Sequence, residues 1–142
     1  MTDAVDLELA TRLRIGIMRL ARRLRHEGSQ GDITPSQLAA LPTIDKRGPL
    51  TLGELAQLER VQPPSMTKIV GNLVDSGLVT RSPDPSDARV ALVAVTKAGR
   101  AHLAATRKRR DAWLEEHLHS LSADERDALA RAADVIERLA DS

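Results

Sequence analysis

The chain has 142 residues, of which 21 are lysine or arginine and 20 are aspartate or glutamate, giving a formal net charge of +1. With 42% hydrophobic and 29% charged residues, it has the composition of one globular domain, or of two small units that share a core. Because there is no cysteine, we expect neither disulfides nor thiol chemistry. No apolar run approaches ~20 residues and no apolar stretch follows a basic start, so we expect neither a membrane-spanning helix nor a signal peptide. A cytoplasmic protein is therefore expected.

Two helices are predicted before residue 50. Over residues 5–27, leucine and isoleucine recur at three- and four-residue steps and most arginines lie outside that stripe, which is typical of an amphipathic helix. A second helix starts at Thr34, which is followed by Pro35 at the first helical position and Gln37 at the third. It must end before Gly48-Pro49, and Pro42 within it predicts a kink or an early turn.

Residues 51–75 have the pattern of a helix-turn-helix. Thr51 and Glu54 form a predicted capping box that opens a short helix, and Gln62-Pro63-Pro64 starts the next one. The buried face of this second helix is expected to consist of Met66, Ile69, Val70 and Leu73. The turn between the helices falls at Glu59 or Arg60 instead of at a glycine, so it must either avoid left-handed geometry or tolerate up to ~1 kcal/mol of strain.

The next segment predicts a two-stranded hairpin. A short apolar run at residues 78–80 is followed by a polar tip at residues 82–89 and by a second apolar run at residues 90–95. A helix sized for the major groove, beside a hairpin with an arginine in its tip, is the way a winged helix holds double-stranded DNA. The near absence of aromatic residues, with Trp113 alone, disfavours a protein that binds single strands by base stacking.

Two more helices are predicted after Thr96, the second of them starting at a capping box formed by Ser122 and Glu125. The fold is therefore expected to be mainly α with a small β-hairpin wing. Because both ends of the chain carry apolar stripes, residues 1–33 and 97–142 are predicted to form a helical dimerisation region and residues 34–96 the DNA-binding region. A two-fold dimer would present two recognition helices ~34 Å apart and read an inverted repeat.

Five blocks of residues, in this order, resemble the MarR family of transcriptional regulators. They are Leu52-Gly53-Glu54-Leu55-Ala56, Gln62 to Val70, Gly77 to Arg81, Asp84 to Arg89, and Val95 to Gly99. The resemblance implies a homodimeric winged helix-turn-helix protein that represses transcription at a pseudo-palindromic operator and is released by a small ligand. The family's wing commonly carries two adjacent arginines, whereas here the first is Ala88 and only Arg89 remains.

Once its apolar face is buried, the second helix of the helix-turn-helix turns polar side chains outward. We expect contacts with DNA from this face and from the wing, at Gln62, Pro64, Ser65, Thr67, Lys68, Asn72, Arg81 and Arg89. Arg89 is the predicted minor-groove arginine. Asp84 and Asp87 are anionic, so their expected task is to fix the loop through backbone amides and to orient Arg89 by an ion pair. The alternatives are a solvated helix face and, for Arg89, a purely structural salt bridge.

An effector is expected in a cleft between the dimerisation helices and the DNA-binding region. By analogy with the family its lining includes Ile17, Leu41, Ile44 and Leu103, and without Phe or Tyr it would suit an apolar or anionic compound. The basic run at residues 107–110 is interpreted as a solvated helix face.

Other classes of function have little support in the sequence. No histidines have metal-ligand spacing, no cofactor motif is present and no catalytic set is recognisable, so neither a metal site, a cofactor nor an enzyme is expected. The competing hypothesis is a winged-helix module that binds a protein partner without sequence-specific DNA binding.

Overall fold

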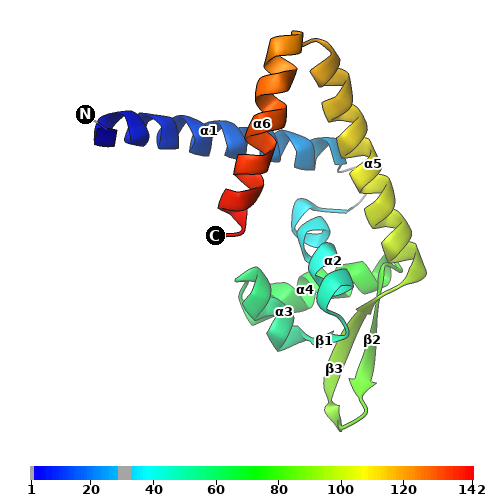
Figure 1. The fold of residues 1–142 in the computed structure, drawn as a ribbon. Coiled ribbons are helices and arrows are strands. Elements are labelled where there is room, and N and C mark those ends of the chain that lie inside the picture. The colour runs from blue at the N-terminus through cyan, green and yellow to red at the C-terminus, as the bar shows by residue number, and fades with distance from the viewer. Residues whose placement is uncertain (1, 29–32) are drawn as a thin grey trace.

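A computed structural model describes residues 2–28 and 33–142, with side chains from residue 4 onward. The described chain has six helices and a three-stranded antiparallel sheet of order β1-β3-β2 (Figure 1), which confirms the predicted mainly α fold with a hairpin wing. The elements are α1 (Thr2–Gly28), α2 (Pro35–Arg47), β1 (Leu50–Thr51), α3 (Leu52–Glu59), α4 (Pro63–Asp75), β2 (Val79–Asp84), β3 (Asp87–Val95), α5 (Lys97–His119) and α6 (Ala123–Ala140).

Hydroxyl side chains cap the starts of α2, α3, α5 and α6. The Thr34 hydroxyl accepts the backbone N–H of Gln37 at 3.3 Å, and the Gln37 side chain accepts the N–H of Thr34, which confirms the predicted capping box. Ser122 and Glu125 do the same at the start of α6, at 3.1 and 2.9 Å. Thr51 caps α3 by accepting one backbone N–H at 3.1 Å, which is half of the box predicted there.

α2 runs through Pro42 and ends at Arg47. The prediction of an early turn at this proline is therefore wrong, whereas the predicted end before Gly48 is confirmed. A proline removes one hydrogen bond from the helix that contains it. The buried side chains of α2, among them Leu41 and Ile44, hold this helix against the core. Tertiary packing therefore outweighs the local preference of Pro42.

The core lies where α2, α3, α4 and the sheet meet. Its large side chains with relative exposure below 2% are Leu41, Ile44, Leu55, Met66, Val70, Leu73 and Val93. Each burial of this kind contributes about 1.5–3 kcal/mol relative to an exposed side chain. The predicted buried face of α4 is confirmed, except that Ile69 is only partly buried and packs against the edge of the cluster.

The wing is a hairpin whose strands are separated by residues 85–86 alone. β2 and β3 pair antiparallel, with a register shift beside Pro83. Both strands reach further into the polar tip than the apolar runs predicted, because ladder hydrogen bonds are made by the backbone and do not require apolar side chains. The short strand β1 was not predicted. It pairs Leu50 with Val93 and so ties the start of α3 to the wing.

Thr96 joins the wing to α5. Its N–H donates to the carbonyl of Leu78 at 3.0 Å, and its hydroxyl donates to the carbonyl of Gly77 at 2.7 Å. The same hydroxyl accepts the N–H of Gly99 at 3.0 Å, which caps α5. A Cβ added at Gly99 would collide with the carbonyl oxygen of Leu78 and lie 2.6 Å from the side chain of Val95. The first turn of α5 is therefore pressed onto the loop after α4, and α5 leaves the wing at a fixed angle.

We expect Gly99→Ala to lower the free energy of unfolding by about 2–3 kcal/mol, because the added methyl group must displace backbone atoms. Gly53→Ala is the matched control, since its Cβ would meet only the Thr51 hydroxyl, at 3.9 Å. In a helix the control exchange is expected to stabilise by about 0.5–1 kcal/mol. Denaturant unfolding of both variants measures the difference, and equal stabilities would contradict the tight packing at Gly99.

Two arginines fasten α1 to α5. Arg109 donates to the carbonyl of Gly28 at 2.8 Å, and Arg110 donates to the carbonyl of Leu24 at 3.2 Å. The Gly28 carbonyl is one of the last four of α1, which lack intrahelical partners, and both carbonyls lie near the C-terminal end of the helix, which attracts cations. The basic run at residues 107–110 is thus only in part the solvated face that was predicted, because its last two residues are half-buried and serve as structural clamps.

His102 lies close to this clamp and makes stability depend on pH. The Thr106 hydroxyl is 3.5 Å from Nδ1 of His102 and accepts a hydrogen bond from Arg109 at 3.3 Å. Burial, and then the positive charge of Arg109, lowers the pKa of His102 below its ordinary value of 6.5. The unfolded chain therefore takes up this proton first as the pH falls below 6.5, and the folded state loses stability. We expect Tm to fall less between pH 7.5 and 5.5 in His102→Gln than in the unaltered protein; identical pH profiles would contradict this role.

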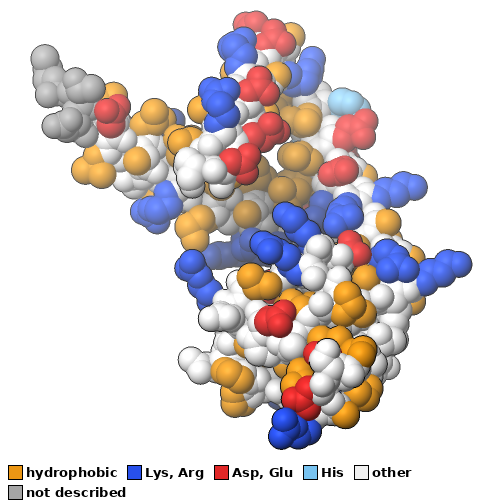
Figure 2. Space-filling model, turned by 60° about the horizontal axis from the view of Figure 1, so that its bottom comes forward, with side chains coloured by type: hydrophobic (Ala, Val, Ile, Leu, Met, Phe, Trp, Pro, Cys, Tyr) orange, Lys and Arg blue, Asp and Glu red, His pale blue; other side chains and the backbone are white. Residues whose placement is uncertain are grey.

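α1, α5 and α6 extend from the core as helical arms (Figure 1). α6 has no buried residue, and the α1 side chains Leu9, Leu13, Ile17 and Leu20 are 39 to 51% exposed. Between the arms lies an apolar hollow of about 420 Å³, lined by Leu20, Leu114, Leu118, Leu129, Ala133 and Ile136. Figure 2 shows hydrophobic side chains gathered between α5 and α6. None of the described helices is long and apolar enough to cross a membrane.

Candidate nucleic-acid interface

α4 presents a polar face to solvent, because its apolar side chains point into the core. The side chains expected to contact DNA from this helix are all exposed: Gln62, Pro64, Ser65, Thr67, Lys68 and Asn72. The hydroxyl of Thr67 donates to the carbonyl of Pro63 at 3.0 Å, so it can offer only its acceptor side to a nucleic acid. Gln62 is the N-cap residue but does not cap α4 with its side chain. The face thus combines amides, hydroxyls and one cation, which suits base edges and phosphates.

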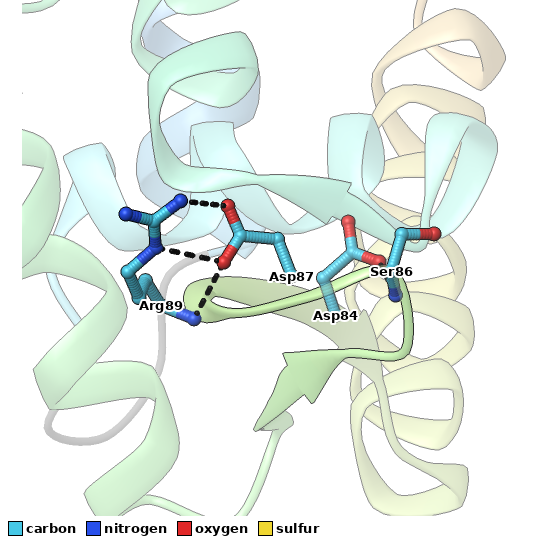
Figure 3. Close-up of polar contacts among 4 residues, drawn as sticks. All are labelled: Asp84, Ser86, Asp87 and Arg89. Carbon is cyan, nitrogen blue, oxygen red and sulfur yellow. Dashed lines mark hydrogen bonds and ion pairs between the residues drawn. The ribbon is translucent and has the colours of Figure 1, made fainter.

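Arg89 and Asp87 form a two-pronged ion pair at the wing tip (Figure 3). Nε of Arg89 is 3.1 Å from Oδ1 of Asp87 and Nη2 is 3.2 Å from Oδ2, while the N–H of Arg89 also donates to Oδ1, at 3.1 Å. Hydrogen bonds from the Arg89 side chain and then from its backbone lower the pKa of the Asp87 carboxyl below its ordinary value. Asp84 accepts the N–H of Ser86 at 2.8 Å and so closes the turn. The Arg89 side chain is 90% exposed and remains accessible to a partner.

The positive character of this surface depends on where its basic and acidic side chains lie rather than on the net charge of the chain. Residues 51–100 contain six basic and five acidic side chains. Three of the acids, Asp84, Asp87 and Glu59, accept local hydrogen bonds. Among the described residues Lys68 and Arg81 form no ion pair, and both are exposed. Basic side chains without ion-pair partners, next to acidic side chains that already accept hydrogen bonds, favour the binding of a polyanion such as DNA.

The turn between α3 and α4 is closed by a Schellman motif. The N–H of Val61 donates to the carbonyl of Ala56 at 2.9 Å, and the N–H of Arg60 donates to that of Gln57 at 3.3 Å. The motif requires a left-handed residue, and Arg60 adopts φ 54° and ψ 45°. Of the two alternatives predicted for this turn, the strained left-handed one is therefore present, at a cost of about 1 kcal/mol.

Known proteins share both the sequence and the architecture. The sequence model of the MarR family matches residues 33–91. An HTH-type transcriptional regulator of Mycobacterium leprae is 46% identical over 136 residues, which cover 96% of this chain and 95% of the relative. The chain belongs to the MarR family.

Solved structures agree with membership of the MarR family. A transcriptional regulator of Pseudomonas aeruginosa is 36% identical and superposes with a TM-score of 0.84 over 95% of each chain. The multiple antibiotic resistance repressor MarR is 28% identical, with a TM-score of 0.73 over 90% of this chain and 94% of its own. The protein is therefore a DNA-binding winged helix-turn-helix transcriptional regulator and not an enzyme, as the sequence predicted.

The wing departs from the MarR pattern at Ala88, where the family commonly has an arginine. Ala88 is exposed beside Arg89, so the position has room for a longer side chain. At the wing tip, Arg89 must then provide alone the charge that the resemblance assigns to two adjacent arginines. This difference gives Arg89 more weight among the predicted contacts, which remain predictions.

The residues predicted to line an effector cleft in this MarR chain stay a prediction. Leu41, Ile44 and Leu103 are at most 4% exposed and pack inside the core, while Ile17 lies on the exposed part of α1. A cleft of about 110 Å³ lies between α1, α2 and α5, with Arg25, Leu38, Pro42 and Arg110 in its wall. Apolar periodicity identifies buried positions, but it does not show which of them are packed closed and which border a cleft.

No metal site accompanies the interface in the part of the chain that the structure describes, where no three His, Asp or Glu side chains gather around one point.

Proposed function

We propose that the protein is a repressor that binds a pseudo-palindromic operator as a homodimer and is released by a small anionic or apolar ligand. The observation that carries this proposal is the exposed polar face of α4 beside a wing whose tip holds an oriented arginine. The multiple antibiotic resistance repressor shares the fold, which supports a repressing role. Because the operator is genomic DNA, we place its action in the cytoplasm.

The proposed contacts divide between the two grooves and the backbone. α4 enters the major groove, where Ser65, Lys68 and Gln62 reach base edges or phosphates near the start of the helix. Pro64, Thr67 and Asn72 complete the contacting face. Arg89 enters the minor groove, and Arg81, on β2, binds the phosphate between the two grooves. Asp84 and Asp87 keep the wing tip and Arg89 in position through the contacts described above.

The homodimer is proposed from the apolar surface of the arms. Residues 1–33 and 97–142 expose apolar side chains on α1 and α6, including Leu129 at 48% and Leu139 at 60%. Apolar side chains exposed together on one face often mark an interface with a partner. A second copy packed against the hollow between α5 and α6 would bury it. Two-fold symmetry would then place the two copies of α4 about one DNA turn apart, ~34 Å.

The cleft lined by Arg25 and Arg110 is the proposed place of the ligand. Burial, and then the positive charges of Arg25 and Arg109, lowers the pKa of the Arg110 guanidinium. A bound anion would relieve this repulsion. The cleft holds about 110 Å³, whereas ligand sites commonly hold about 300–1,000 Å³. A ligand larger than a few atoms must therefore move α2, and with it the DNA-binding region.

Selection of bound sites from random duplex DNA tests the proposed DNA recognition. We expect an inverted repeat, with an affinity that falls steeply as salt rises because several phosphates are neutralised in each half-site. Enrichment of no sequence, with weak and salt-insensitive binding, would favour the alternative of a winged-helix module for a protein partner.

Release by a ligand is tested on the selected operator. We expect benzoate, an apolar ring with one carboxylate, to raise Tm and to weaken operator binding. Arg25→Gln, in the wall of the same cleft, should remove both effects while the operator is still bound in the absence of benzoate. Release that persists in this variant would place the ligand elsewhere.

A further inference from the structure

We propose that Arg60, in the turn between α3 and α4, binds a phosphate of the operator beside the contacts made by α4. The inference rests on the operator binding proposed above and adds to it a contact that sequence spacing did not identify. It follows from the cleft at the start of α4, from the backbone N–H groups that are missing in the first turn of this helix, and from the backbone geometry of Arg60.

Arg60 shares a surface cleft with the first residues of α4. The cleft holds about 500 Å³, and its wall includes Gln57, Arg60, Gln62 and Pro63. Gln62 is the N-cap of α4 and Pro63 its first residue, so the guanidinium group is attached two residues from the end of the helix that meets DNA. A phosphate in this cleft would lie beside the polar face of α4.

The start of α4 is poor in the groups that usually hold a phosphate. Backbone N–H groups in the first turn of a helix commonly bind phosphate, but Pro63 and Pro64 have no N–H. Two donors are therefore missing from the first turn of α4, whereas α2, which begins at Pro35, lacks one. A cation on the preceding turn replaces them, and Arg60 is that cation.

No carboxylate neutralises Arg60 within the described chain, where its side chain takes part in no ion pair. Its neighbour Glu59 is directed to α2 instead and accepts a hydrogen bond from the Thr43 hydroxyl. An exposed guanidinium without a partner can donate two parallel hydrogen bonds to one phosphate.

The backbone conformation of Arg60 carries a conformational cost. The Schellman motif requires left-handed geometry, which glycine adopts freely and arginine does not. Arg60 has φ 54° and is the only residue other than glycine with a positive φ in the described ranges. Strain that a commoner residue would relieve indicates that this side chain serves something other than the fold.

Arg60→Gly tests this contact, because it removes the charge and the strain together and so should change stability and binding in opposite directions. We expect Tm to stay the same or to rise by about 2–5 °C. Affinity for the selected operator should fall roughly tenfold near physiological salt. The slope of log K against log salt should become shallower by about 1.8, which is ~0.9 for the lost phosphate of each half-site.

Arg60→Lys keeps the charge and should keep most of the salt slope. Arg107→Gln removes an exposed charge from α5, outside the interface, and should leave both affinity and slope unchanged. If Arg60→Gly loses stability, Arg60→Asn measures the same loss of charge in a residue that tolerates left-handed geometry.

The possible results separate the contact from the function on which it rests. An unaltered protein that binds the operator, with an Arg60→Gly variant of unchanged affinity and slope, would overturn the contact at Arg60 and leave the proposed function standing. An unaltered protein that binds no duplex in a salt-dependent way would overturn the proposed function, and the contact with it.

Discussion

Arg89→Ala is expected to reduce operator affinity by at least ~30-fold while the protein remains folded. A dimer loses two such arginines, and each base-directed arginine contributes about 1–3 kcal/mol of binding free energy. The side chain is 90% exposed and its only ion-pair partner among the described residues is Asp87, so its loss leaves the core untouched. A gel-shift titration at matched salt measures the change.

Three variants place that result in context. Arg89→Lys keeps the charge but cannot form the two-pronged pair with Asp87, so an intermediate affinity is expected. Asp87→Asn keeps Arg89 and removes the carboxylate that orients it, which separates the orienting role from the contact itself. Arg107→Gln controls for the loss of one positive charge. Near-normal affinity of Arg89→Ala would mean that the pair at the wing tip is purely structural.

Ile136→Asp is expected to convert the protein to a monomer and to weaken operator binding by about 10²–10⁴-fold, because the second half-site would no longer be bound within one assembly. Ile136 is 39% exposed and lines the hollow between α5 and α6. A carboxylate there would have to be buried without a partner in the proposed dimer. Sedimentation equilibrium measures the mass, and the gel shift measures the affinity.

Val135→Asp is the matched control for that change. Val135 lies next to Ile136 on α6 and is 46% exposed, but helical spacing turns it to the opposite side from the hollow. We expect this variant to stay dimeric and to bind the operator. A dimeric Ile136→Asp protein would show that the copies meet through another surface.

The sequence predicted most of the fold because local signals and burial agree. Thr34 and Ser122 cap helices that their apolar stripes require independently, and the three- and four-residue spacing from Met66 to Leu73 defines the face of α4 that is buried. The strand β1 was missed since two residues carry no periodicity, and Leu50 is recognisable as a strand residue only once β3 lies beside it.

The candidate interface was predicted less completely. Outward-facing residues of α4 and the tip arginine follow from spacing, so the sequence identified them as candidates. The clamp by Arg109 and Arg110 depends on carbonyls about eighty residues earlier in the chain, which no local pattern reveals. Arg60 was not among the contacts predicted from the sequence, for a different reason. What distinguishes it is a positive φ, a backbone angle that most residues avoid and that spacing does not reveal.

α5 is one unbroken helix. At its start Thr96 bonds it to the end of α4, beside the wing, and further along Arg109 bonds it to α1. A residue inserted near its middle would turn the DNA-binding region against the arms by about 100° and shift it by about 1.5 Å. In the proposed dimer, the length of α5 would therefore set the relative orientation of the two DNA-binding regions, independently of the side chains proposed to contact DNA. Seven inserted residues, close to two full turns, would nearly restore that orientation while moving the DNA-binding region about 10 Å further along α5.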